Sequence, residues 1–291
     1  MAAFDALTRF VFEDAAVRGE LIHLDDSWRE VLSRAEYPGY LQTLLGELTA
    51  AAGLLIATLK YEGNLTLQMQ GNKAVRLLVV EMTSSLHVRA TAKWDAEASE
   101  TTFSNMMSDG QLVITLTPAT ESHRSYQGIV PLIGGSVAEA LMHYMTQSEQ
   151  IDSVIVLAAD EQCAAGMMLQ RLPDRPDGDA ETWARASHFG ATLKAEELLH
   201  LDTDLILHRL FHEEDLRVFE PQPVQFACSC SRTRVADMLK LLGQEEVESV
   251  LEEQGLIEVQ CEFCGQLYHF DPIDAAQLWL ENSVPPVHTK H

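Results

Sequence analysis

The chain has 291 residues, of which 46% are hydrophobic, and carries a formal net charge of −24 at pH 7. This length predicts one or two domains with ample chain for a sizeable core. The charge argues against a nucleic-acid surface, which needs clustered Lys and Arg, and against anionic membranes. No signal peptide or apolar run of about 18 residues is evident, so we expect a cytoplasmic protein without a membrane span.

The first 173 residues are expected to form an α+β domain with antiparallel strands and few helices. A long helix rich in Leu and Ala is predicted at 40–60, where Ala51-Ala52-Gly53 would permit close packing against a sheet. A shorter helix is predicted at 28–34 and another at 137–146. Apolar runs predict strands at 6–12, 17–24 and 151–157, an apolar segment at 163–172, and an antiparallel meander at 65–70, 75–82, 86–92, 112–117 and 126–130.

A run with two prolines and a glycine at 172–178 marks a boundary. Residues 174–227, with 12 acidic and 5 basic side chains and recurrent leucines, are predicted to be helical. This segment is too apolar for a disordered tether and too charged for a core of its own, so it must lie on another domain. It is either an ordinary pair of docked helices or a linker that docks only while a metal site holds it.

Four of the five cysteines form two tight pairs, Cys228-Ser229-Cys230 and Cys261-Glu262-Phe263-Cys264. Four thiolates make a complete tetrahedral shell for zinc and select Zn or Fe–S over hard ions. Residues 228–291 are too few for a large core, so a metal staple is expected. Helices are predicted there at 233–242, 245–254 and 273–280, and a strand at 256–260. Each pair can also close as a disulfide, and the spacing alone does not decide between a structural and a redox role.

Other candidate sites are weaker. Cys163 stands alone in an apolar segment and is expected to be a buried core residue. His208 and His212 have the i,i+4 spacing of metal ligands but lack a His-Glu-x-x-His motif, so exposed helix histidines are expected. His269 lies near Cys264 in sequence and would support the site from outside the ligand set. No catalytic motif is found, and we expect no enzymatic activity.

The cysteine pairs, together with Ser231 and Tyr268-His269-Phe270, resemble the 33-kDa heat-shock protein family of redox-regulated holdase chaperones. Further matches cover essentially the whole chain: Arg18-Gly19-Glu20, Leu44-Leu45-Gly46-Glu47-Leu48, Tyr61-Glu62-Gly63 and Gln127-Gly128-Ile129-Val130. The resemblance implies that one Zn²⁺ binds to Cys228, Cys230, Cys261 and Cys264 in the reduced form. It also implies that oxidation forms the disulfides Cys228–Cys230 and Cys261–Cys264, releases zinc and exposes a surface for unfolding client proteins, without ATP. Dimerisation on activation is a further implication.

The resulting prediction has three parts: an α+β core domain at 1–173 that binds clients, a metastable helical linker at 174–227, and a zinc-binding redox-switch domain at 228–291. The alternative is a zinc-ribbon adaptor that binds a fixed protein partner. Residues 228–291 carry 4 basic and 11 acidic side chains, which weighs against nucleic acid as that partner. An Fe–S protein is a third, weaker option.

Overall fold

The computed structural model of the protein describes residues 5–60, 62–71, 75–95, 102–107, 109–120, 124–173 and 180–280. The chain divides into two compact units, Met1–Ala227 and Cys228–His291. Within the predicted boundary at 172–178, residues 174–178 lie outside the described residues. Both units mix helices with antiparallel strands, which confirms the predicted α+β class.

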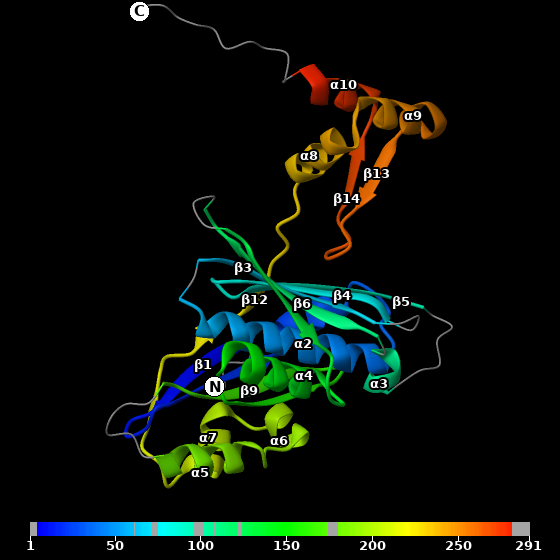
Figure 1. The fold of residues 1–291 in the computed structure, drawn as a ribbon. Helices are drawn as coiled ribbons and strands as arrows, with labels where there is room; N and C mark the ends of the chain where they lie inside the picture. Colours follow the sequence, from blue (N-terminus) through cyan, green and yellow to red (C-terminus); the bar gives the residue numbers. More distant parts are fainter. Residues whose placement is uncertain are drawn as a thin grey trace, which may run out of the picture. The chain divides into compact units, whose positions relative to one another are not determined.

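The first unit holds two six-stranded sheets (Figure 1). Sheet A has the order β10-β1-β2-β9-β8, with β11 also paired to β1, and all its pairings are antiparallel. The strands of this sheet are buried on both faces. One face contributes Leu7 and Ile22 to the main core, and the other contributes Phe10 and Leu21 to a second core shared with a layer of helices. Its strands are β1 (Ala6–Phe12), β2 (Val17–Leu24), β8 (Ser153–Ala159), β9 (Ala164–Arg171), β10 (Leu216–Val218) and β11 (Gln222–Pro223).

Sheet B has the order β12-β5-β4-β3-β6-β7. The meander is correctly predicted for the first three strands, and the fourth and fifth pair with each other in sequence order as β6 and β7. The prediction that they continue the meander from its third strand is wrong, because β6 pairs with β3 and not with β5. A long connection that contains α3 (Phe103–Met106) lets the chain return to the free edge of β3, and β12 occupies the edge of β5. The strands are β3 (Gly63–Gln70), β4 (Val75–Thr83), β5 (His87–Trp94), β6 (Gln111–Pro118), β7 (Tyr126–Pro131) and β12 (Gln225–Phe226).

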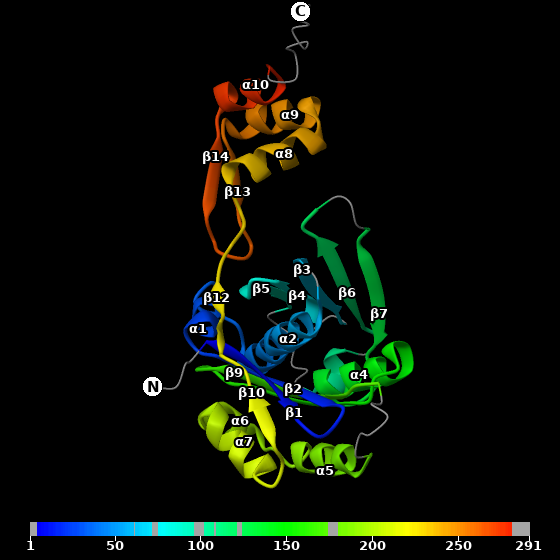
Figure 2. The same ribbon diagram turned by 90° about the vertical axis from the view of Figure 1, so that its left-hand side faces the viewer.

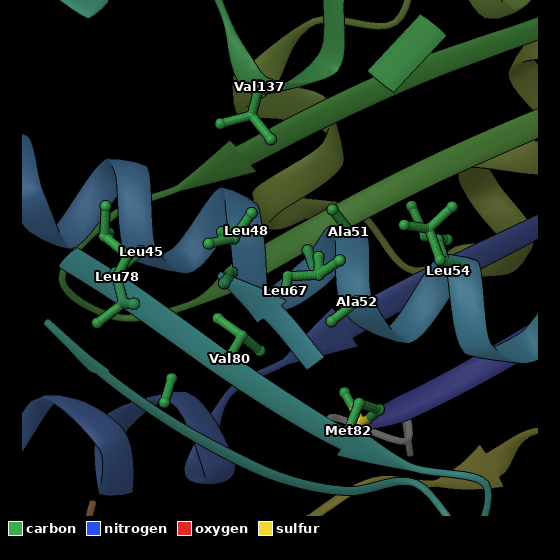
Figure 3. Packing of buried hydrophobic residues seen from close by; sticks show 14 of the residues in the cluster. Leu45, Leu48, Ala51, Ala52, Leu54, Leu67, Leu78, Val80, Met82 and Val137 are labelled. Carbon is green, nitrogen blue, oxygen red and sulfur yellow. The ribbon is translucent and has the colours of Figure 1, made fainter. Parts of the chain in front are cut away.

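Helix α2 (Gly39–Thr58) lies between the two sheets and forms the centre of the main core (Figures 1 and 3). A Cβ at Gly53 would lie 2.2 Å from Ile22 Cδ1 of sheet A, which explains why a glycine is needed at this close approach. On its other side, Leu48 packs in one cluster with Leu67 and Val80 of sheet B. By length and composition α2 would also cross a membrane, but 72% of that apolar window is buried inside the protein.

Three shorter helices of this unit accompany the main core, and the last of them continues directly into a π-helical turn. They are α1 (Asp26–Leu32), α3 and α4 (Val137–Tyr144), followed by the π-helical turn Met145–Glu149. Ser136 caps α4 by accepting a hydrogen bond from the Glu139 backbone N–H.

The described part of the linker forms three helices rather than a pair: α5 (Ala180–Gly190), α6 (Ala195–His200) and α7 (Thr203–Phe211). They cover the outer face of sheet A, as Figure 2 shows, so the segment does lie on the first domain. Their apolar side chains share a second core with Phe10, Phe12 and other sheet residues. The buried residues that this segment contributes are Ala186, Leu198, Ile206, Leu207 and Phe211 from the helices and Leu193 from the connection between α5 and α6.

The second unit contains α8 (Arg232–Leu242), α9 (Gln244–Gln254), the hairpin β13 (Ile257–Gln260) and β14 (Leu267–Phe270), and α10 (Pro272–Leu280). The strand β14 was not predicted. Ser231 caps α8 by accepting a hydrogen bond from the Arg234 backbone N–H. The core is small and consists of Leu239, Val247, Ile257, Phe270, Ala275 and Leu278.

Candidate metal centre

The four paired cysteines come together at one end of the second unit. Cys228 and Cys230 lie in the extended segment before α8, and Cys261 and Cys264 lie in the turn between β13 and β14. All four sulfur atoms lie within 4.8 Å of one another, and each side chain is partly buried. Within the described ranges, this is the only group of three or more side chains placed to share a metal ion.

The sulfur positions fit a tetrahedral metal. The Sγ atoms of Cys228 and Cys261 are 3.6 Å apart, and those of Cys230 and Cys264 are 3.4 Å apart. A tetrahedron of thiolates with metal–sulfur bonds of about 2.3 Å has edges of about 3.8 Å, close to both distances. A disulfide bond would need about 2.05 Å, and all four thiols are free. The donor set therefore suits a soft divalent ion.

The hairpin turn orients Cys261 and Cys264 toward the same point. The Cys261 N–H donates to the Gln266 carbonyl at 2.9 Å, and the Gly265 N–H donates to the Cys261 carbonyl at 2.8 Å. Gly265 has φ 72°, in the left-handed region that side-chain-bearing residues avoid. Backbone N–H groups of Phe263 and Cys264 also donate to the Cys261 sulfur, which favours its thiolate form.

Without a cation, crowding and burial oppose ionisation of these thiols. Burial, together with hydrogen bonds to the Cys230, Cys228 and Cys261 thiols, raises the pKa of Cys264 to about 12. Burial likewise raises the pKa of Cys261. A bound dication would reverse this effect because it stabilises the deprotonated sulfurs directly.

Tyr268, rather than His269, contacts the cysteine cluster. The Tyr268 hydroxyl donates to the Cys230 sulfur at 3.1 Å, and this bond, followed by burial, raises the Tyr268 pKa to about 12. The predicted supporting role of His269 is wrong, because adjacent strand residues point to opposite faces. His269 Nδ1 lies 3.3 Å from Glu258 Oε1 instead. The sequence held a signal for Tyr268, because it lies two residues before the apolar Phe270 and residues two apart in a strand share a face.

Arg232 connects the segment that carries Cys228 and Cys230 to the hairpin and the last helix. Its guanidinium lies 4.3 Å from the Phe270 ring centroid and donates to the His269 carbonyl at 2.6 Å. It also pairs with Asp274 at 2.7 Å, which lowers the pKa of that carboxyl group. These contacts keep the two cysteine pairs together across the small unit.

The remaining sequence candidates lie in the first unit. Cys163 is buried, as predicted; burial raises its pKa to about 12, and its thiol donates to the Leu199 carbonyl at 3.4 Å. His208 on α7 and His212, which directly follows the last residue of α7, are both exposed, as predicted, and their ring centroids lie 5.8 Å apart. Neither histidine belongs to a group of three potential ligands among the residues that the structure describes.

Comparison with known proteins settles the family. The family model described as "Hsp33 protein" matches residues 5–271. The chain belongs to the Hsp33 family. Its relatives include the 33 kDa chaperonin of Methylobacillus flagellatus, 49% identical over 288 residues and 98% of both chains. The 33 kDa chaperonin of Chromobacterium violaceum is 50% identical over 276 residues and 94% of both chains. The family resemblance read from the sequence is thus confirmed.

The fold agrees with a solved member of the Hsp33 family. The crystal structure of the 33 kDa chaperonin (heat shock protein 33 homolog) from Thermotoga maritima matches with a TM-score of 0.81 and 22% sequence identity. The match covers 96% of this chain and 99% of that chain. The two chains therefore share their fold along nearly their whole length.

Proposed function

We propose that this protein is a redox-regulated, ATP-independent holdase chaperone of the cytoplasm. Membership of the Hsp33 family, whose relatives are named 33 kDa chaperonins, supports the chaperone role. The observation that carries the regulation is the cluster of four free thiols within 4.8 Å of one another. The protein acts by binding unfolding clients and not by catalysis.

In the reduced form, Cys228, Cys230, Cys261 and Cys264 hold one Zn²⁺. A structural zinc site of this kind contributes about 10–16 kcal/mol to folding. The small core of the second unit cannot supply comparable stability, because a domain of this size buries only a modest part of its surface. The thiolates therefore decide whether residues 228–291 form a folded redox-switch domain.

Oxidation converts the four thiolates into two disulfides. As each pair of thiolates closes to a disulfide, it gives two electrons to an oxidant such as hydrogen peroxide, which takes up two protons and is reduced to water. The resemblance to the family implies the pairs Cys228–Cys230 and Cys261–Cys264. In this structure the sulfur atoms of Cys228 and Cys261 lie 3.6 Å apart and those of Cys230 and Cys264 lie 3.4 Å apart, so close approaches also run between the two pairs. Peptide mapping of the oxidised protein tests the pairing directly.

Loss of the thiolates removes the metal-binding energy, and the switch domain opens. Residues 174–227 then act as a metastable linker: their helices leave sheet A and uncover the apolar residues that they share with it. Clients bind to this surface and to the core domain at 1–173, and the active form dimerises. A net charge of −24 disfavours nucleic acid and anionic membranes as partners.

The test measures zinc content, free thiols and client protection on the same protein before and after peroxide. We expect one zinc per reduced chain, loss of zinc with loss of four thiols, and suppression of light scattering by an unrelated unfolding protein only after oxidation. Zinc that stays bound after oxidation would contradict the switch. Zinc release without protection would favour the alternative, an adaptor for a fixed protein partner.

A further inference from the structure

A pocket of about 450 Å³ opens where α2 ends between the two sheets. Its wall is mostly apolar, with residues from α2, from sheet B and from the segment after α4. Leu59, at the end of α2, is 37% exposed at the pocket. The apolar lining residues are Leu55, Leu59, Leu65, Ile114, Leu116, Met145 and Ile151.

The polar side chains of this pocket are already bonded to one another. Tyr144 donates to Glu149 at 2.7 Å, and the Tyr126 and Tyr144 hydroxyls are 3.1 Å apart. Arg18 donates twice to the Gln170 side-chain oxygen, at 2.6 and 3.0 Å. A ligand gains little from groups that are paired in this way, so recognition in the pocket rests on the apolar wall.

The pocket lies beside the last strand of sheet B. The sheet order ends at β7, and no described strand pairs with the outer edge of β7 (Figure 2). Its Tyr126 is 48% exposed and also lines the pocket, and Ile129 is 62% exposed. An extended segment that paired with this edge would place every second side chain on the pocket side of the sheet.

We propose that the β7 edge and the adjoining pocket bind an extended, unfolded client segment that has apolar residues at alternate positions and basic or neutral residues between them. This inference rests on the chaperone function proposed above. The net charge of −24 selects against acidic segments and opposes a second copy of this acidic chain as the occupant. Backbone pairing with β7 supplies affinity for many sequences, and the pocket selects an apolar side chain.

The direct test is the binding of a labelled peptide to the oxidised full-length chain, measured by fluorescence anisotropy. The probe is a nine-residue peptide with leucine at every second position and lysine or threonine between, with blocked ends. We expect saturable binding. Replacement of lysine by glutamate, or methylation of alternate backbone nitrogens, should weaken binding about tenfold or more.

Two pairs of variants locate the site. Leu116→Trp fills the pocket, and Val113→Trp places the same ring on the opposite face of the same strand. Leu59→Lys puts a charge at the pocket, and Leu205→Lys puts one at a similarly exposed leucine of α7. The pocket variants should weaken peptide binding about tenfold and the controls less than about twofold. Thermal unfolding identifies any variant that fails to fold. If Leu116→Trp does not fold, the comparison of Leu59→Lys with Leu205→Lys decides whether the pocket binds the peptide, because Leu59 is partly exposed and tolerates substitution better.

Absence of saturable binding, or equal binding by Leu59→Lys and Leu205→Lys, overturns the site. A dimer that Leu59→Lys disrupts, seen by analytical ultracentrifugation without peptide binding, also overturns it in favour of a second copy. The aggregation assay on the oxidised wild-type chain separates the two proposals. Client protection without peptide binding refutes only the site, whereas peptide binding without client protection refutes the holdase function.

Discussion

Truncation of Ile206 on α7 should loosen the linker helices from sheet A, whereas the same truncation of the adjacent Leu205 should not. Ile206 is 1% exposed and belongs to the core shared with sheet A, but Leu205 is 45% exposed. Ile206→Ala removes three buried carbons, worth about 0.8 kcal/mol each in transfer, and leaves a cavity, for a total of about 2–5 kcal/mol. Leu205→Ala should cost less than about 1 kcal/mol.

Hydrogen exchange along residues 180–211 of the reduced, zinc-loaded protein measures this difference. A loss of 2 kcal/mol corresponds to exchange about 30-fold faster wherever local opening controls exchange. If the linker is the switch, Ile206→Ala should also suppress client aggregation without oxidant, while Leu205→Ala stays inactive. Equal protection of the linker in both variants would refute the assigned docking face. A loosened linker that does not bind clients would refute its role as the switch.

Three further outcomes are expected. The double variant Cys261→Ser/Cys264→Ser should lose zinc and the fold of the second unit, and full zinc occupancy in it would contradict the ligand assignment. Cys163→Ser should keep oxidant-driven zinc release and client protection with a stability change of about 1 kcal/mol; loss of either, with the fold intact, would reveal a functional thiol. Burial raises the Glu20 pKa to about 7, against the partial opposition of Arg18 and Arg9. The native state then keeps this proton up to higher pH than the unfolded state, so stability falls by about 3 kcal/mol between pH 4.5 and 7, and Glu20→Gln should remove that fall in pH-dependent urea unfolding.

The sequence predicts local features of this fold well, because periodic apolar patterns and turn residues act over a few positions. The central helix and most strands are found this way. The partner of β6 is not predictable, because the choice between the edges of β3 and β5 depends on a long connection and on where β12 returns. Which face of α7 packs against sheet A could not be predicted either. The composition requires that one face is docked, but only the structure shows that this face contains Ile206 and not Leu205.

The candidate metal centre follows from cysteine spacing, since short pairs of thiols at a turn have few other uses. The side chains that surround the metal centre cannot be predicted from that spacing. β14 has only four residues, too few for a periodic pattern to stand out, so the orientation of its side chains was unknown. Proximity in sequence favoured His269, whereas the pleat of the strand directs Tyr268 to the Cys230 sulfur.

The segment between the linker helices and Cys228 covers one edge strand of each sheet in the first unit. β10 and β11 pair with β1 of sheet A, and β12 then pairs with β5 of sheet B. Exposed sheet edges are templates for aggregation, so this short stretch also protects the protein against pairing with other copies of its own sheets. Pulling it away would uncover an edge of each sheet together, and the solubility of the chain would then depend on a client or a second copy to cover them. The amides of Gln225 and Ala227, which donate to carbonyls of Leu86 and Val88, report that event by faster hydrogen exchange.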